Sequence, residues 1–242
     1  MGSKSSIEWT EYTWNPVTGC TKISPGCLNC YAERMAARLS AMGQPRYRNG
    51  FEPTLHPEML ALPSRWKKPR RIFVNSMSGL FHESVPIAFI DKVFHAISNA
   101  PWHTFQVLTK RTERLRSLSD RLPWPRNLWM GVTVESIRHL PHIDDLRASG
   151  ACLKFIFFEP LLGSVPAPDL DGIDWEIAGG ESGPRARPMA EEWVKDIRDA
   201  CVAQSVAFFF KQCGGWNKKA RGRILGDRIW HEYPGEALAH CS

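Results

Sequence analysis

The amino-acid sequence indicates an α/β fold, namely a partial or full (β/α) barrel of parallel strands with six to seven β/α units. Apolar runs of strand length alternate with segments of helical periodicity, which is the pattern of repeated right-handed β-α-β units. Most of these runs are nearly continuous in apolar character, as expected for strands covered on both faces. An open doubly wound sheet is the alternative. No glycine-rich dinucleotide fingerprint follows the first strand, which weighs against its Rossmann version.

The expected strands fall into one short segment and six clear runs. The short segment covers residues 12–15, and the runs cover residues 71–75, 104–109, 128–133, 153–159, 175–178 and 206–211. Helical patterns fill most of the gaps. They cover residues 30–42, 112–122, 139–149 and 190–204, together with a helix that follows Ser84 as a cap and has Pro86 in its first turn. We expect Pro141 to interrupt the helix over 139–149, and residues 160–174 to form a long loop.

No linker or shift in composition divides the chain, so we expect residues 1–242 to form a single β/α barrel domain. A loop with three cysteines lies near its N-terminus. Tyr31, Met35, Leu39 and Met42 share one face of the helix that follows this loop. The last residues, 237–242, are expected to be a loose tail.

Charge and cysteine content limit the classes of partner and compartment. The 31 basic and 25 acidic residues give a net charge of +6, which favours anionic partners, with nucleic acid first among them. A soluble protein that is merely basic is the alternative. No apolar run is long enough to cross a bilayer, and the first residues lack the apolar core of a secretory signal. The seven cysteines are unevenly spread and do not resemble a disulfide framework, so a cytoplasmic location is predicted.

Cys20, Cys27 and Cys30 lie within eleven residues of one another and form an incomplete metal site. A structural zinc site has four protein ligands, and an iron–sulfur cluster usually has four thiolates. Three cysteines therefore leave one coordination position for a substrate or cofactor.

Polar side chains follow the strands where loops lead into helices, which is the end of a parallel barrel that carries chemistry. Glu159 ends an otherwise apolar run, and a buried carboxylate there needs a partner or a ligand. The expected rim comprises Ser76, Ser78, Lys110, Arg111, Glu135, Glu159, Glu181, Arg185, Arg187, Lys211 and Cys213.

The stretch Asn15-Pro16-x-x-Gly19-Cys20, followed by Cys27-x-x-Cys30-Tyr31-Ala32 before a β/α repeat, resembles the radical S-adenosylmethionine superfamily, and most of all its spore photoproduct lyase branch. Later segments, at 108–110, 158–163 and 179–183, are similar to an uncharacterised phage and bacterial family named for its three-cysteine motif. The match spans roughly residues 6–216. Family likeness leaves the substrate open.

The resemblance implies a [4Fe–4S] cluster on Cys20, Cys27 and Cys30, with S-adenosylmethionine chelating the fourth iron. Reduction would release a 5′-deoxyadenosyl radical that takes a hydrogen atom from the substrate. The spacing departs from the usual Cys-x3-Cys-x2-Cys, because six residues separate the first two cysteines. The turn Ser24-Pro25-Gly26 could absorb the extra length.

By analogous position, the resemblance also implies cofactor contacts on the rim. Ser76 and Ser78 would lie near the amino group of S-adenosylmethionine, Lys110 would meet its carboxylate, and Glu135 would accept its ribose hydroxyls. Further candidates are Tyr31 for the adenine, Glu159 as a cofactor-binding carboxylate, and Cys213 as a hydrogen-atom donor, although a structural role for Cys213 is the alternative. Gly179-Gly180-Glu181 looks like a superfamily motif that belongs after an earlier strand, so its role is not transferred.

A basic stretch from Lys211 to Arg223 contains Trp216 and lies on the same rim as Arg185 and Arg187. Cations beside an aromatic ring suit a phosphate backbone with a stacked base. The sequence therefore favours a radical enzyme that modifies or repairs a nucleic-acid base and is served by an electron donor protein. The alternatives are a radical enzyme acting on a protein or small molecule, and a non-enzymatic nucleic-acid-binding module in which the cysteines and a histidine hold Zn²⁺. The oligomeric state is left open.

Overall fold

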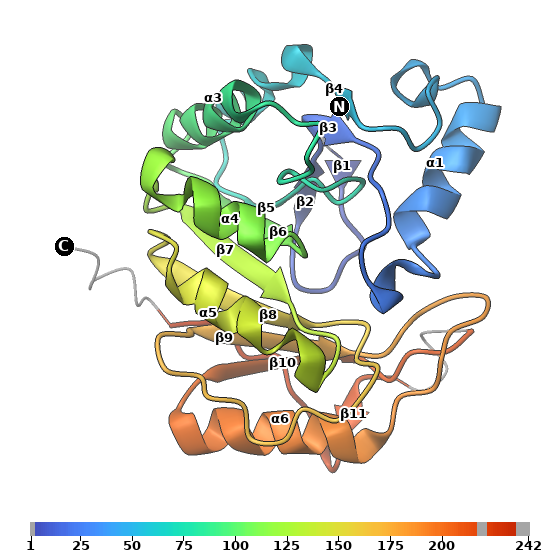
Figure 1. The fold of residues 1–242 in the computed structure, drawn as a ribbon, viewed down its shortest axis with the longest axis vertical. Helices are drawn as coiled ribbons and strands as arrows, with labels where there is room; N and C mark the ends of the chain where they lie inside the picture. Colours follow the sequence, from blue (N-terminus) through green and yellow to red (C-terminus); the bar gives the residue numbers. More distant parts are fainter. Residues whose placement is uncertain (1–2, 217–221, 236–242) are drawn as a thin grey trace.

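A computed structural model describes residues 3–216 and 222–235 of the chain. Its main sheet has eight strands in the order β1-β2-β5-β6-β7-β8-β9-β10 and curls into a half-barrel (Figure 1). β1 pairs antiparallel with β2, whereas every other neighbouring pair is parallel. The predicted partial barrel of parallel strands is confirmed.

The main sheet has eight strands, and seven of them lie within one residue of their predicted positions. The eight strands are β1 (Ser3–Lys4), β2 (Tyr12–Trp14), β5 (Arg71–Val74), β6 (Thr104–Thr109), β7 (Leu128–Thr133), β8 (Leu153–Phe158), β9 (Trp175–Gly179) and β10 (Ala207–Gln212). The short β1 was not predicted. Two small ribbons pair β3 (Val17–Thr18) with β4 (Thr54–Leu55) and β11 (Ile224–Leu225) with β12 (Arg228–Ile229).

The helices include α1 at the open side of the half-barrel and α3 to α6, which cover the outer face of the sheet (Figure 1). Their bounds are α1 (Tyr31–Ala41), α2 (Leu62–Arg65), α3 (Ile87–Ser98), α4 (Thr112–Leu118), α5 (Pro141–Arg147) and α6 (Glu191–Gln204). Single 3-10 turns lie at Pro25–Cys27, Pro45–Tyr47, Pro57–Met59, Ser119–Arg121 and Ile137–His139. Residues 160–174 contain no helix or strand, as predicted.

Two helix starts differ from expectation because of proline geometry. Pro141 does not interrupt its helix but begins α5, where its missing N–H leaves no hydrogen bond unmade. Pro86 caps α3, and the Ser84 side chain makes no capping hydrogen bond. The Ser84 N–H donates instead to His82 Nδ1 at 3.0 Å.

Two hydrophobic clusters lie on opposite faces of the sheet. The larger packs strand residues such as Ile156 and Phe158 against α3 to α6. The smaller fills the concave face with aromatic side chains, including Phe155 and Trp175, and with Trp9 from the segment before β2. A Cβ at Gly131 would lie under 3.0 Å from the Phe155 ring, so only glycine leaves room for that ring. The hollow of the half-barrel is therefore packed with aromatic rings.

The apolar stripe expected on α1 is largely exposed. Tyr31, Met35 and Met42 are 50%, 42% and 61% exposed, whereas Ala32 and Ala36 are buried. The helix thus packs against the body through its small residues.

Candidate functional site

The three cysteines lie in the loop that joins β2 to α1, at the carboxyl end of the sheet. This cysteine loop, residues 15–30, first runs beside the segment that follows β5. The Gly19 N–H donates to the Met77 carbonyl at 3.0 Å, and Ser78 Oγ donates to the Val17 carbonyl at 2.8 Å. Gly19 has a φ of 82°, and a Cβ there would lie under 3.0 Å from the Glu52 backbone. The parallel pairing of β2 with β5 therefore continues until it delivers Cys20 to the rim.

Arg111 holds the loop next to Cys20. Its Nη2 donates to Thr21 at both the carbonyl, 3.2 Å, and Oγ1, 2.8 Å, and its Nη1 lies 3.7 Å from Cys20 Sγ. Burial raises the pKa of the Cys20 thiol, and the nearby Arg111 charge opposes this rise. The charges of Cys27 and Cys30 raise the pKa further, so the three sulfurs lie within electrostatic reach of one another.

Glu135, at the end of β7, fastens the turn between Cys20 and Cys27. Its Oε1 accepts from Ser24 Oγ at 2.5 Å, and its Oε2 accepts from the Gly26 N–H at 2.7 Å. Lys110 completes the group with an ion pair to Oε1. Burial opposes the charge of Glu135, but Lys110 and these hydrogen bonds outweigh it and lower the pKa of Glu135. The buried carboxylate is therefore paired on both oxygens.

Cys27 lies in an environment that favours its thiolate. Burial alone would raise the pKa of this thiol, but hydrogen bonds with the Ile23 backbone and with Ser24, together with the Lys110 charge, lower it. The Ser24 hydroxyl lies 3.4 Å from Cys27 Sγ. Thiolate is the form that binds metals.

Glu181 fastens the segment between Cys27 and Cys30. Its Oε2 accepts from Asn29 Nδ2 at 3.0 Å, and Asn29 also donates to the Arg185 carbonyl at 2.9 Å. Arg187 forms a two-point pair with Glu181, at 2.6 and 2.9 Å. A Cβ at Gly183 would lie 2.7 Å from Arg34 of α1, so this loop and the helix approach closely. The first and last parts of the rim are thus joined across the open side of the half-barrel.

Glu159, at the end of β8, lies next to β10. Its Oε1 accepts from Lys211 Nζ at 2.6 Å and from Gln212 Nε2 at 3.5 Å. Its Oε2 is buried and has no hydrogen-bond partner among the described residues. A Cβ at Gly179 would lie 2.9 Å from that oxygen, so the glycine keeps the adjacent space open. The expected partner of this carboxylate is therefore Lys211, and one oxygen remains available.

Several predicted cofactor contacts are engaged with the protein itself. Ser76 Oγ lies 3.2 Å from Asn15 Oδ1, and the Ser76 carbonyl accepts the Tyr31 hydroxyl. Ser78, Lys110 and Glu135 make the loop contacts given above. The structure brings all these residues to the rim, and their contacts with a cofactor remain predictions.

Cys213 follows β10 but packs against the larger core beside the helices. Its carbonyl lies so close to Gly180 that a Cβ there would clash with it. This packing favours the structural role for its thiol, and hydrogen-atom donation remains a prediction.

Among the described residues, few basic side chains of the predicted rim are unpaired. Lys211 and Arg187 are paired with Glu159 and Glu181, and Arg223 lies over the Phe209 ring at 4.6 Å from its centroid. Residues 217–221, with two lysines and an arginine of the predicted patch, lie outside the described residues. Arg185 and Trp216 are exposed, and Trp216 is 78% exposed.

The cysteine loop offers three thiol donors to the group that it was predicted to hold. Cys20, Cys27 and Cys30 are free thiols. Among the described residues, no three His, Cys, Asp or Glu side chains are arranged to hold one metal ion. Ligands of a single Zn²⁺ crowd around one ion at about 2.3 Å. The thiolates of a [4Fe–4S] cluster bind separate irons and stand farther apart. The set fits a cluster in its chemistry and is not a preformed zinc site.

Sequence reasoning placed Arg111, Glu135 and Glu181 on the rim but missed their contacts with the cysteine loop. Asn29 and Glu181 are 152 positions apart, and Arg111 and Thr21 are 90 apart. Only the strand-end position of Arg111 and Glu181 gave a signal, because parallel strand ends share one edge. No sequence signal pointed to Glu83, which pairs with Arg111, or to His82.

The structure also has a cavity that lies away from the rim. A cavity of about 520 Å³ lies at the opposite end of the sheet, lined by residues such as Ile173, Gln204 and Ala207, and it shares none of the rim residues.

Among the described residues, no helix is both long and apolar enough to span a membrane. Cys152 is disulfide-bonded, and the cytoplasmic location remains a prediction.

Comparison with solved structures shows which known fold this chain shares. The half-barrel is similar to solved structures of spore photoproduct lyase. A double mutant with bound AdoMet and dinucleoside spore photoproduct matches with a TM-score of 0.51 and 11% identity, over 88% of this chain and 59% of that one. A tyrosine-to-phenylalanine mutant matches with a TM-score of 0.52 and 11% identity, over 87% and 78%. A cysteine-to-serine mutant matches with a TM-score of 0.51 and 12% identity, over 87% and 58%. The likeness shows a shared fold, and the chain spans less than two thirds of the first of these structures.

The family is defined by sequence. Residues 4–234 match the family described as "Protein of unknown function (DUF5131)", so the chain belongs to that family. No curated protein matches the sequence.

Proposed function

We propose that this protein is a radical S-adenosylmethionine enzyme whose Cys20, Cys27 and Cys30 hold a [4Fe–4S] cluster. The observation that carries the proposal is the way three separate strand ends fasten the cysteine loop. Arg111 holds Thr21, Glu135 holds Ser24 and Gly26, and Glu181 holds Asn29, so each segment beside or between the cysteines has its own buried polar anchor. A loop that merely connected β2 to α1 would not need such anchors. Its likeness to spore photoproduct lyase in fold supports the same conclusion.

When bound, the cluster and S-adenosylmethionine would supply a 5′-deoxyadenosyl radical. The chain's own residues orient and enclose these groups. The lowered pKa of Cys27 favours a thiolate ligand, and the aromatic packing of the concave face keeps water away from the inner side of the rim. Glu159 is the strongest candidate for a cofactor contact, because its Oε2 is buried without a partner and lies beside Gly179. Lys110, Glu135, Ser76, Ser78 and Tyr31 are further candidates, and each would have to exchange an existing contact for one with the cofactor.

The substrate proposed is a nucleic-acid base. Trp216 offers an exposed ring and Arg185 an exposed cation on the same rim, and the net charge of +6 favours a polyanion. A structural relative was solved with a dinucleoside spore photoproduct, which supports this substrate class. A protein or small-molecule substrate is the second candidate, and the exposed apolar stripe on α1 favours a protein partner, which could also be the electron donor.

The reaction is tested by cleavage of S-adenosylmethionine. Protein prepared without oxygen and reduced with dithionite should form 5′-deoxyadenosine, and Cys27→Ala should abolish this product. Cys201→Ala is the matched control, since Cys201 is a buried thiol on α6 outside the loop. A colourless wild-type protein that binds zinc and forms no 5′-deoxyadenosine would contradict the proposal and support the zinc-binding module.

A further inference from the structure

Arg111 places a buried positive charge beside Cys20. Only 6% of its side chain is exposed, and its Nη1 lies 3.7 Å from Cys20 Sγ. A Cβ at Gly79 would lie 3.5 Å from the same sulfur and 4.0 Å from Nη1, so a larger residue would narrow the space around this pair. The function proposed above requires Cys20 as a ligand but gives this cation no role beyond holding Thr21.

The guanidinium is fixed in this position by a carboxylate and by the cysteine loop. Its Nε lies 2.9 Å from both oxygens of Glu83, and its Nη2 donates twice to Thr21. These contacts use the planar fork of arginine, which is always charged. A lysine would keep the charge but not the geometry.

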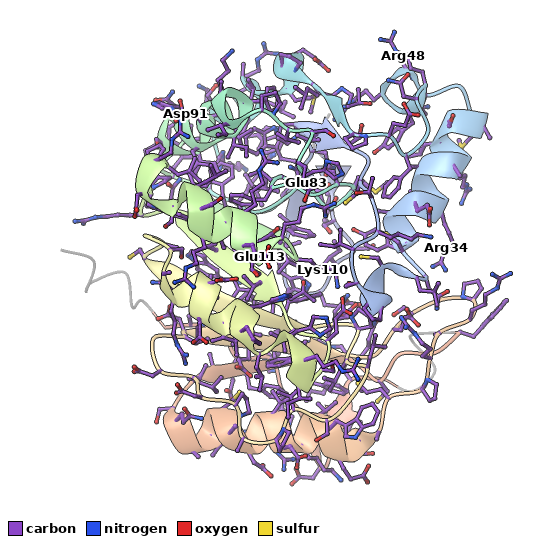
Figure 2. The ribbon with its side chains drawn as sticks, in the orientation of Figure 1. Arg34, Arg48, Glu83, Asp91, Lys110 and Glu113 are labelled. Carbon is purple, nitrogen blue, oxygen red and sulfur yellow. The ribbon has the colours of Figure 1, made fainter. Side chains whose placement is uncertain are left out.

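The two charges of this pair lie in different surroundings. The Arg111 side chain is 6% exposed, whereas the Glu83 side chain is 65% exposed. Water screens the charge of Glu83 more than that of Arg111. The field at Cys20 is therefore net positive. Figure 2 shows Glu83 near the middle of this view, with Lys110 labelled below it.

The neighbouring histidine adds no second cation. The Ser84 N–H donates to His82 Nδ1 at 3.0 Å, so Nδ1 accepts and the ring proton is on Nε2, which lies 2.9 Å from Thr21 Oγ1. Burial and the Arg111 charge lower the pKa of His82, which keeps the ring neutral. Arg114 donates to the backbone carbonyls of His82 and Val85, while Lys110 is neutralised by Glu135. Arg111 is thus the cation that faces Cys20.

We propose that Arg111 is a positioning residue that raises the reduction potential of a cluster bound through Cys20, and that Glu83 moderates this effect in the opposite direction. Reduction adds one electron, and so one negative charge, to the cluster. Net charge and hydrogen bonds to the sulfurs set the potential of such a cluster, and a nearby cation favours the reduced form. The inference rests on the function proposed above.

The test compares midpoint potentials by redox titration monitored with electron paramagnetic resonance. The proteins are wild type, Arg111→Met, Arg111→Lys, Glu83→Gln and the control Arg116→Gln, which removes an ion pair between Arg116 of α4 and Asp145 of α5. Arg111→Met should make reduction at least about tenfold less favourable, a decrease of about 59 mV for one electron. Glu83→Gln should increase the potential by a smaller amount, because that carboxylate is screened. Arg111→Lys should fall between Arg111→Met and wild type.

The decisive result is a decrease in midpoint potential for Arg111→Met together with an increase for Glu83→Gln. A purely structural role would change the potential in the same direction in both variants. Shifts of the same sign, or none in either variant, overturn the inference while leaving a functional cluster in the wild type. If Arg111→Met fails to fold, Glu83→Gln carries the test, and an unchanged or decreased potential overturns the inference. Wild-type protein that binds no iron overturns the proposed function, and the inference falls with it.

Discussion

Glu135 and Gly26 meet at 2.7 Å, where the Gly26 N–H donates to a buried carboxylate oxygen. The contact joins the end of β7 to the turn between Cys20 and Cys27. A Cβ at position 26 would lie under 3.0 Å from both carboxylate oxygens, so only glycine permits this approach. The extra residues between the first two cysteines are therefore part of a defined turn that is held by the sheet.

Gly26→Ala should move this turn away from Glu135 and weaken retention of the cluster. We expect the iron content of anaerobically purified protein to fall by at least about half, because the added methyl separates a charge-assisted hydrogen bond worth about 1.5–3 kcal/mol. Gly235→Ala is the matched control, since a Cβ there meets nothing within 4 Å. Equal iron in wild type and Gly26→Ala would show that the turn does not need this contact.

Lys110→Met should destabilise the folded protein by about 3 kcal/mol, because it leaves the buried Glu135 carboxylate without its ion pair. The pKa of Glu135 is lowered in the folded state, so its ionised form stabilises the fold above about pH 4.5, and this contribution is lost as pH falls. The loss of stability caused by Lys110→Met should therefore be smaller at pH 4 than at pH 7. Urea unfolding at pH 7 and pH 4 measures both effects. The double variant Lys110→Met, Glu135→Gln should recover much of the loss, and an equally unstable double variant would contradict the electrostatic explanation.

The strands could be predicted closely from sequence, whereas the contacts that anchor the loop could not. β7 and β8 are almost unbroken apolar runs bounded by polar residues, so their composition alone defines them. The convergence of Lys110 and Glu135 followed from the rule that parallel strand ends share an edge. Their mutual ion pair did not, because it depends on side-chain lengths and on the course of a loop from a distant part of the chain. The exposed stripe on α1 could not be predicted either, since helical periodicity shows which residues share a face but not whether that face is covered.

Glu176 should give the protein an unusual dependence of stability on pH. It is fully buried in β9 next to Cys201, and burial raises its pKa to about 8. Between about pH 4.5 and 8 the unfolded chain ionises while the folded protein keeps the proton, so stability falls as pH rises, by about 1.4 kcal/mol per unit. Glu176→Gln should remove this slope, whereas the exposed Glu192→Gln should retain it. Chemical unfolding at a series of pH values measures it, and parallel curves for wild type and Glu176→Gln would contradict the assignment.

Trp216→Ala should weaken binding of single-stranded nucleic acid by about 5- to 150-fold, corresponding to a stacking contribution of about 1–3 kcal/mol for one base. Fluorescence anisotropy with DNA and RNA oligonucleotides of about twelve nucleotides measures the effect. Trp102→Ala serves as control, because Trp102 is 39% exposed and precedes β6, at the opposite end of the sheet. Equal losses in the two variants, or none in Trp216→Ala, would remove this ring from the substrate surface and favour a protein or small-molecule substrate.

The iron content of protein purified without oxygen tests the role of the cysteine loop most directly. We expect a brown protein with about four irons per chain, and loss of this iron when Cys20, Cys27 or Cys30 is replaced by alanine. A colourless wild-type protein with one zinc per chain, or iron that survives all three substitutions, would contradict the account.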